Sequence, residues 1–176
     1  MSAKKKDLSV YDEASIPSAE EFRFGIVVSE WNREITHALY EGCYATLLKH
    51  GADPEEIQVI QVPGSFELTS GAKLLIANRK VDVVICLGCV IQGETRHNEY
   101  INQAVASGLT NLGMATSKPC IFGVLTPNTL EQAKARAGGA NGNKGVEAAV
   151  TAIRMAALSR QLGLKEKRIG FQSNRS

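Results

Sequence analysis

The sequence lacks several features that would assign it to a broad class of protein. No apolar run among its 176 residues approaches the length that spans a bilayer. The polar start Met1–Asp7 does not resemble a signal peptide, so we expect a cytoplasmic protein. The net charge is only +2, which gives no reason to expect binding to nucleic acid or to an anionic membrane. The length is typical of one domain, and no internal repeat divides it.

The motifs of the common nucleotide-binding sites are also absent. The sequence has no G-x-G-x-x-G after its first expected strand and no G-x-x-x-x-G-K-[ST] anywhere. The segment Gly138–Gly145 is rich in glycine and contains Lys144, but it follows an expected helix and not a strand, so it is no P-loop. A nicotinamide- or ATP-dependent enzyme is therefore disfavoured.

Cysteine is scarce, with only Cys43, Cys86, Cys89 and Cys120 in the chain. Cys86 and Cys89 have the spacing of a C-x-x-C metal or redox motif. They lie, however, within the apolar run Val81–Ile91, which predicts a strand, and residues three apart on a strand point to opposite faces. We therefore expect buried, reduced thiols and neither a metal site nor a disulfide.

Short apolar runs alternate with helical patterns along the chain. Strands are expected at Phe24–Ser29, Ile57–Val62, Val81–Ile91 and Cys120–Leu125. Helices are expected from about Ile35 to His50–Gly51, at Phe66–Ala77 with Ser65 as its cap, after Gly93–Thr95, from Thr126–Pro127 to Arg136, and after the loop Gly138–Gly145. This alternation predicts an α/β fold, a parallel sheet with helices on both faces.

The two ends of the chain show no such pattern. We expect residues 1–21 to be a tail, either disordered or laid over a neighbouring subunit. Residues 22–162 should form the domain, and residues 163–176 a polar, frayed end. In a parallel α/β sheet, ligands gather at the carboxyl ends of the strands, so the loops that follow the strands are where a site is expected.

The loop Gly93–His97 follows the longest expected strand and opens a helix. Free amides at a helix start bind anions, and Gly93 lets a phosphate approach the backbone. His97 would lie in the first helical turn beside such a phosphate, where an imidazole can accept or donate a proton. A surface histidine at a helix start gives the same pattern, so position alone leaves both interpretations open. For His37 and His50, within and at the end of an ordinary helix, we expect no function.

Three further segments suit ligand binding, each with an ordinary structural alternative. In Pro63–Glu67, the amides, the Ser65 hydroxyl and the Glu67 carboxylate could hold a polar small molecule, or form a simple capped turn. Trp31 follows the first strand and suits stacking on a flat heterocycle or anchoring a core or interface. Arg136 and Lys144 could hold a phosphate or complement a helix dipole.

With these segments in place, the chain resembles the lumazine synthase family from about Phe24 to Leu162. The resemblance rests on short segments in the family's order: Val62–Glu67, Gly88–Thr95 with His97 and Tyr100, Phe122–Thr126, Thr129–Ala133, Arg136–Gly138 and Gly142–Gly145. Each segment alone is common, but together and with this spacing they are highly specific. The resemblance implies a flavodoxin-like, three-layer fold with a four-stranded parallel sheet.

The resemblance also implies a reaction. A family member is a transferase of riboflavin biosynthesis, which joins 5-amino-6-(D-ribitylamino)uracil to 3,4-dihydroxy-2-butanone 4-phosphate. The products are 6,7-dimethyl-8-ribityllumazine, phosphate and water, and neither a metal nor an organic cofactor is implied. Imine formation, phosphate elimination and ring closure need proton transfer and an anchored phosphate, which fits one histidine among many positioning groups.

The roles of individual residues follow from the resemblance by position. His97 matches the proton-transfer histidine. Trp31 matches the stacking residue, and Ser65, Phe66 and Glu67 match the segment that holds the ribityl chain and ring. The backbone of Cys89, Val90 and Ile91 matches the strand end that binds the uracil edge, and Glu94 and Thr95 match the phosphate loop. Phe122 and Arg136 match groups from an adjacent subunit, and Lys144 matches a lysine near the site.

Three positions depart from the family pattern. Asn98 follows His97 where an aromatic residue is usual, Trp31 stands where phenylalanine is commoner, and Gln92 stands where a basic residue is frequent. None of these departures removes a catalytic group. Asn98 changes the packing expected beside His97, and Trp31 offers a larger ring for stacking on flavin-like heterocycles.

The family assembles as pentamers, and in some members as a hollow shell of twelve pentamers. Because Arg136 would have to reach a neighbour's site, we expect at least a homopentamer, and the short loop Gly138–Gly145 favours the icosahedral shell. Expected partners are the two small-molecule substrates, further copies of the chain and riboflavin synthase.

Two rival interpretations remain at this stage. A non-catalytic flavin- or lumazine-binding protein of the same fold would use Trp31 as its stacking platform, but it would need neither His97 nor Arg136. A flavodoxin-like signalling or electron-transfer domain would need a phosphate loop after the first strand, or an acidic cluster, and Glu30–Arg33 supplies neither.

Overall fold

The sheet has four strands, β1 (Phe24–Ser29), β2 (Ile57–Val62), β3 (Val83–Cys89) and β4 (Cys120–Leu125), in a computed structural model that describes residues 6–168. All neighbouring strands are parallel, in the order β2-β1-β3-β4. Every residue of β1 and β3 is buried, which explains why both segments are near-continuous apolar runs. The predicted parallel sheet is confirmed, with β3 shorter at both ends than expected.

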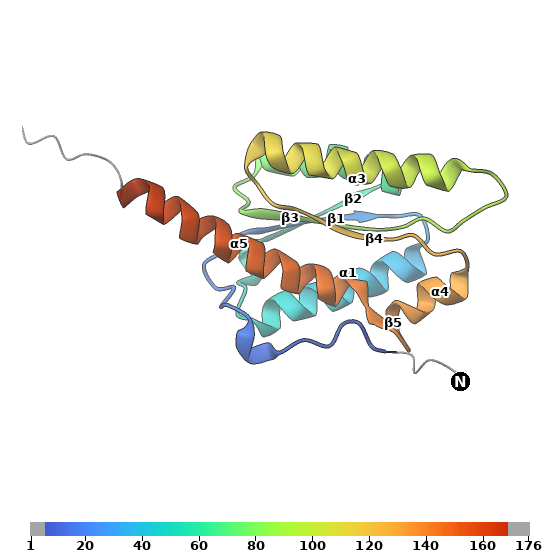
Figure 1. The fold of residues 1–176 in the computed structure, drawn as a ribbon, viewed down its shortest axis with the longest axis horizontal. Helices are drawn as coiled ribbons and strands as arrows, with labels where there is room; N and C mark the ends of the chain where they lie inside the picture. The colour runs from blue at the N-terminus through green and yellow to red at the C-terminus, as the bar shows by residue number, and fades with distance from the viewer. Residues whose placement is uncertain (1–5, 169–176) are drawn as a thin grey trace, which may run out of the picture.

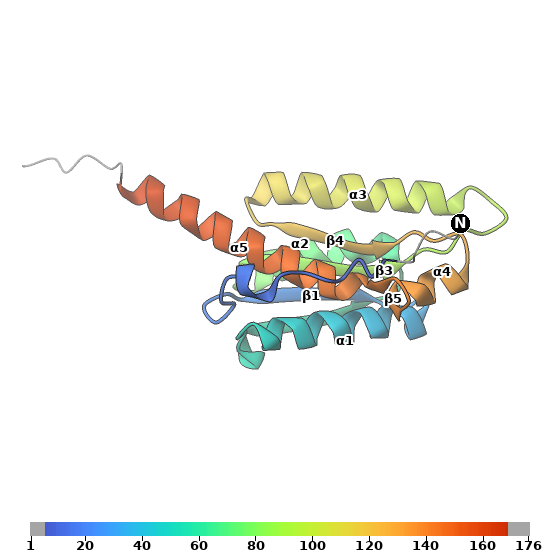
Figure 2. The ribbon, with the colours of Figure 1, turned by 60° about the horizontal axis from the view of Figure 1, so that its bottom comes forward.

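Helices cover both faces of this sheet, so the molecule has three layers (Figures 1 and 2). One face carries α2 (Leu68–Asn78) and α3 (His97–Thr116), and the other carries α1 (Arg33–Lys49) and α5 (Lys144–Arg168). The short helix α4 (Leu130–Ala135) follows β4. Within residues 6–168, three 3₁₀ turns complete the helical elements: Glu13–Ser15, Pro54–Glu56 and Ser65–Glu67. No helix in residues 6–168 is long and apolar enough for a membrane span.

Each face of the sheet has its own apolar core. Phe24, Ile26 and Ile85 pack with the α1 and α5 side, whereas Val27 and Val84 pack with the α2 and α3 side. The alternation along a strand therefore divides successive side chains between two layers.

The cysteines follow the same alternation. Cys86 belongs to the α2 and α3 core and Cys89 to the α1 and α5 core, so the C-x-x-C pair is split between opposite faces, as the sequence predicted. All four cysteines are free thiols. Burial raises the pKa of Cys89 to about 11, which keeps this thiol neutral and a poor nucleophile near pH 7.

Two predicted helix starts are wrong. Ser65 does not cap a helix: its residue is buried and its hydroxyl lies 3.5 Å from that of Ser29, while Gly64 precedes the 3₁₀ turn and α2 begins only at Leu68. Thr126–Pro127 does not open α4. The cap is Thr129, whose side chain accepts a hydrogen bond from the Gln132 amide. Several adjacent residues favour capping, and packing selects among them.

The segment Gly138–Gly145 is not a plain loop. It contains a small antiparallel hairpin of β5 (Ala137–Gly139) and β6 (Gly142–Asn143), which leads directly into α5. Gly138 and Gly142 have φ of 103° and 82°, a left-handed backbone that glycine adopts without a steric cost.

The N-terminal segment lies across its own subunit. The Leu8 amide donates to the Asn141 carbonyl at 3.3 Å, and the Tyr11 hydroxyl lies 3.0 Å from Nε2 of His50. Ala19 is fully buried. The expectation of disorder is therefore wrong for residues 6–21, and contact with a neighbouring subunit stays a prediction. Residues 1–5, and residues 169–176 of the expected frayed end, lie outside the described residues; α5 itself continues to Arg168.

Candidate active site

A cleft of about 560 Å³ opens at the carboxyl edge of the sheet, where parallel α/β folds bind ligands. It lies between the segments that follow β1, β2 and β3 and the first turn of α3. Its lining residues are Trp31, Asn32, Gly64, Ser65, Phe66, Glu67, Cys89, Val90, Ile91, Gly93, Thr95, His97, Asn98, Tyr100 and Ile101. Nine of the predicted site residues thus lie around one cavity: Trp31, Ser65, Phe66, Glu67, Cys89, Val90, Ile91, Thr95 and His97.

The aromatic wall of the cleft is exposed. Trp31 is 67% exposed and Phe66 is 58% exposed, unusually high fractions for large apolar side chains. The backbone of Trp31 is nevertheless fixed, because its amide donates to the Pro63 carbonyl at 3.1 Å. Exposed rings on a fixed backbone suit stacking on a planar ligand.

The polar side of the cleft is built from the turn after β2. One carboxylate oxygen of Glu67 accepts a hydrogen bond from the Gly64 amide at 3.0 Å, which orients this half-buried side chain. Ser65 lines the cleft but is buried, and its hydroxyl lies 3.5 Å from that of Ser29.

The end of β3 supplies backbone groups to the cleft floor. The Cys89 carbonyl accepts a hydrogen bond from Nδ2 of Asn32 at 2.9 Å. The Val90 amide donates to the Leu125 carbonyl at 2.9 Å, and the Gln92 amide donates to the Pro127 carbonyl at 3.0 Å. The amide of Ile91 lies between these two engaged amides.

His97 is the first residue of α3, as predicted, and its side chain is exposed at the cleft. Free amides at this helix start can receive an anion next to the imidazole. The preceding Arg96 forms an exposed ion pair with Glu99 at 2.8 Å, on the surface of the same turn.

The two predicted cationic side chains, Arg136 and Lys144, do not line this cleft. Arg136 and Lys144 line a second hollow of about 620 Å³, formed by the end of β4, by α4 and by the hairpin. Arg136 donates through Nη1 to the Asn141 carbonyl at 2.7 Å and through Nη2 to Glu147 at 2.5 Å. Lys144 donates to the other oxygen of Glu147 at 3.2 Å. One carboxylate therefore holds both cations.

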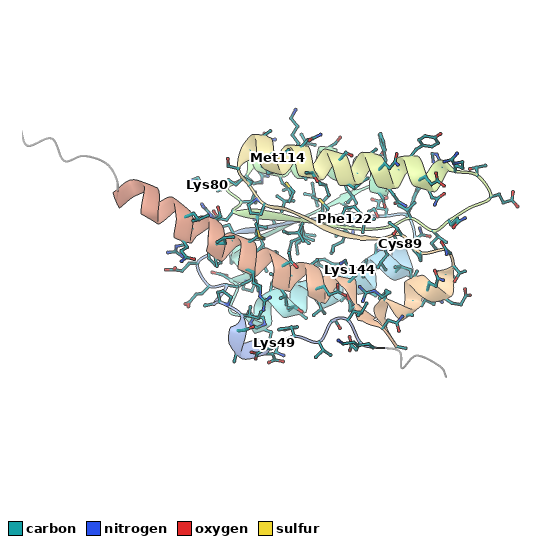
Figure 3. All side chains as sticks on the ribbon, viewed as in Figure 1. Lys49, Lys80, Cys89, Met114, Phe122 and Lys144 are labelled. Carbon is teal, nitrogen blue, oxygen red and sulfur yellow. The ribbon has the colours of Figure 1, made fainter. Side chains whose placement is uncertain are left out.

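Phe122 and Glu94 line neither hollow. Phe122, on β4, packs against the α2 and α3 core, and Glu94 is an exposed residue of the loop before α3. Figure 3 shows Cys89 at the edge of the sheet near the start of α3 and Lys80 at the opposite edge, with Lys144 on α5. The second hollow, lined by Arg136 and Lys144, is called the cation hollow below. The cleft and the cation hollow both open at the carboxyl edge of the sheet but are separate on one subunit.

Several residues that line the cleft or contact the predicted cations were not assigned a site role from the sequence. Tyr100 lies one helical turn after His97, and Glu147 lies one turn after Lys144, a spacing that places each pair on one helix face. That spacing could have identified both residues. The contact between Asn32 and Cys89 joins residues far apart in the sequence, which no local pattern reveals.

Comparisons with known proteins indicate one family. The profile described as 6,7-dimethyl-8-ribityllumazine synthase matches residues 21–160. A protein of that name from Parabacteroides distasonis is 52% identical over 88% of this chain and 97% of its own length. One from Cytophaga hutchinsonii is 54% identical over 89% of this chain and 98% of its own length. One from Phocaeicola vulgatus is 49% identical over 95% of this chain and 96% of its own length.

Proposed function

Because this chain belongs to the 6,7-dimethyl-8-ribityllumazine synthase family, we propose that the carboxyl-edge cleft is where it makes lumazine. The enzyme is a transferase of riboflavin biosynthesis. It condenses 5-amino-6-(D-ribitylamino)uracil with 3,4-dihydroxy-2-butanone 4-phosphate and releases 6,7-dimethyl-8-ribityllumazine, phosphate and water. The observation that carries the assignment is the single cavity that brings His97, the exposed Trp31 and the carboxyl end of β3 together.

The flat substrate would bind between the aromatic wall and the end of β3. Trp31 and Phe66 offer exposed rings for stacking on the pyrimidine. At the floor, the Cys89 carbonyl and the Val90 and Gln92 amides are already engaged, so we assign reading of the uracil edge to the amide of Ile91. Glu67, held by the Gly64 amide, would accept hydrogen bonds from ribityl hydroxyls.

The sugar phosphate needs cations and free amides. The start of α3, with Glu94 and Thr95 before it, offers backbone donors, and Arg136 offers a planar fork that matches phosphate oxygens. Lys144 adds a second positive charge through the shared Glu147. Together these groups would anchor the phosphate and stabilise it as it leaves.

Proton transfer falls to His97 at the start of α3. Imine formation, loss of phosphate and ring closure each move a proton, and His97 is the exposed imidazole in the cleft. The remaining groups hold two substrates in register, and such positioning can contribute up to roughly 7–11 kcal/mol in favourable cases. The proposed chemistry needs neither a metal nor an organic cofactor.

A complete site would require a second subunit. The cleft and the cation hollow are separate on one subunit, so the Arg136 of one copy would reach the His97 cleft of the next. A head-to-tail contact forms a ring where its rotation closes, and we propose such a ring, a homopentamer in which Phe122 and Arg136 serve the neighbour. The short hairpin segment Gly138–Gly145 favours assembly into an icosahedral shell.

The wider setting remains part of the proposal. We propose that residues 22–162 form the catalytic domain, that the protein works in the cytoplasm, and that its product passes to riboflavin synthase. These assignments are supported by the family and by the position of the cleft within those residues.

An absorbance assay tests the proposal directly. Purified protein is mixed with both substrates in the presence of a chelator, and lumazine formation is followed. Product formed at an undiminished rate would support both the reaction and its independence from a metal. Absence of product, together with quenching of Trp31 fluorescence by riboflavin, would reject the enzyme and favour a flavin-binding protein of the same fold.

A further inference from the structure

Asn32 has a strained backbone and an unusual hydrogen bond. It is one of two non-glycine residues with positive φ in the described chain, at 59°, the other being Ser117 at 53°. Such a left-handed backbone costs free energy for any residue with a Cβ, although Asn tolerates it better than most. Strain of this kind persists where the surrounding structure requires it.

The side chain of Asn32 does not cap its own helix. Asn32 is the N-cap residue of α1, and Asn is among the residues that cap helices best, yet its amide makes no capping hydrogen bond. Instead, Nδ2 donates to the Cys89 carbonyl at 2.9 Å, at the end of β3. A residue suited to stabilise its own helix thus connects the loop after β1 to the neighbouring strand.

This bond completes the attachment of the Trp31 loop. On one side, the Glu30 amide donates to the Val62 carbonyl at 2.9 Å, and the Trp31 amide donates to the Pro63 carbonyl at 3.1 Å. These bonds fix the loop to the end of β2. On the other side, the Asn32 amide fixes it to the end of β3. Trp31 therefore lies between two attachments, one to each neighbouring strand.

The attachment matters because burial does not hold the indole. Trp31 is 67% exposed. A Cβ added at Gly64 would lie 3.5 Å from Cε3 of Trp31, so the ring rests over the turn that Gly64 leaves open. A ring so lightly packed keeps its orientation only if its backbone is rigid, and a mobile ring would lose conformational entropy on stacking.

We propose that Asn32 is a positioning residue: its side-chain amide holds Trp31 in line with the backbone of Cys89–Ile91. A heterocycle stacked on the indole then presents its polar edge to that strand end. This inference rests on the proposed function, which makes Trp31 the stacking group. It assigns Asn32 to the ring-binding half of the reaction and gives it no part in holding the phosphate.

The first test follows the mobility of the indole without any substrate. Trp31 is the only tryptophan of the chain, so the decay of intrinsic fluorescence anisotropy reports on this residue alone. Asn32→Gly keeps the left-handed backbone and removes the amide. Asn32→Asp keeps the side-chain size and replaces the donor with an acceptor that repels the Cys89 carbonyl. Ser117→Gly, at the other left-handed residue and at the end of α3, is the matched control.

We expect both Asn32 variants to enlarge the fast component of the anisotropy decay, and Ser117→Gly to leave it unchanged. If only Asn32→Gly does so, the effect comes from a more flexible backbone and the attachment by the amide is rejected. The proposal is equally overturned if both variants match the parent protein.

The second test separates positioning from a merely structural role. We expect Asn32→Asp to raise KM for ribitylaminouracil by about 5- to 20-fold, as expected for loss of one hydrogen bond that orders a binding group. KM for the sugar phosphate should stay within about twofold. A fall in melting temperature with both KM values unchanged, or an equal rise of both, would show a structural role only and overturn the proposal.

Trp31→Ala distinguishes this inference from the proposed function. If Trp31→Ala leaves KM for ribitylaminouracil unchanged, the stacking role in the proposed function is wrong, whatever Asn32 does. If Trp31→Ala raises that KM and Asn32→Asp does not, the stacking role stands and the positioning role of Asn32 falls.

Discussion

His97 is the one exposed imidazole in the cleft, and its loss should separate chemistry from assembly. We expect His97→Ala to lower kcat by about 10²- to 10⁴-fold, the usual contribution of a general acid or base. Assembly and melting temperature should hardly change, because the side chain is exposed at the first turn of α3. Steady-state kinetics and a sizing column measure both. His37→Ala, an exposed histidine on α1, is the control; equal kcat for the two variants would contradict the proton-transfer role.

Arg136 tests the assignment of the phosphate. We expect Arg136→Ala to raise KM for the sugar phosphate by about 10- to 100-fold, the effect of losing a charge-assisted hydrogen bond. KM for ribitylaminouracil should stay close to that of the parent enzyme. Lys134→Ala, which removes a cation of α4 that pairs with Glu34 at the surface, is the control. A similar loss for both substrates would contradict the assigned role.

The sequence could predict site residues that follow strands and could not predict what holds them. Trp31, Glu67 and His97 each lie just after a strand or at a helix start, so the carboxyl-edge rule places them together. The side-chain amide that holds the Trp31 loop acts between Asn32 and Cys89, which are distant in the chain. This contact depends on β1 lying beside β3 in the sheet, which local periodicity does not specify.

An ion pair between Arg23 and Asp82 joins β1 and β3 at their amino ends and makes the stability of the fold depend on pH. Arg23 donates to both carboxylate oxygens of Asp82 at 2.9 to 3.1 Å, through its amide, Nε and Nη2, just before β1 and β3. Burial would raise the pKa of Asp82, but the hydrogen bonds and charge of Arg23 outweigh it and hold this pKa below the ordinary 3.8.

A pKa lowered in the native state means that the carboxylate stabilises the fold above the ordinary pKa and loses this effect as the pH falls through the native value. We therefore expect Asp82→Asn to lower the free energy of unfolding by about 1–2 kcal/mol at pH 7, since both side chains are partly exposed. The difference should shrink as the pH falls from the ordinary 3.8 through the lower native pKa. Denaturant titrations at fixed protein concentration measure it, with the exposed Glu55→Gln as control; a constant difference across pH would exclude the linkage.

Strands buried on both faces were easier to predict from the sequence than the starts of helices. The run Phe24–Ser29 is apolar because helices cover both of its faces, and its bounds match the prediction. Helix starts failed where neighbouring residues share capping ability, as with Thr126 and Thr129. The hairpin after α4 was missed because β5 and β6 are too short for a period of two to appear.

The described part of the chain has two separate hollows at the carboxyl edge of the sheet, and the proposed function divides the active site between them. The cleft holds His97 and the aromatic wall, while the second hollow holds Arg136 and Lys144. The proposed function needs both sets of groups on the same two substrates. If they meet only across a subunit contact, the isolated chain should be inactive, and an active monomer on a sizing column would reject the shared site.

Mixing two inactive variants tests the shared site most directly. In a ring with head-to-tail contacts, a complete site forms where an Arg136→Ala subunit supplies His97 and its neighbour, a His97→Ala subunit, supplies Arg136. With random, equal mixing of co-expressed subunits, about a quarter of the contacts carry both intact groups. We expect about a quarter of the parent activity at a sugar-phosphate concentration well below the parent KM, where the Arg136→Ala protein alone retains about a tenth of that activity or less. Activity no higher than the average of the two variants would place both groups in one subunit's site and remove the argument for a pentamer.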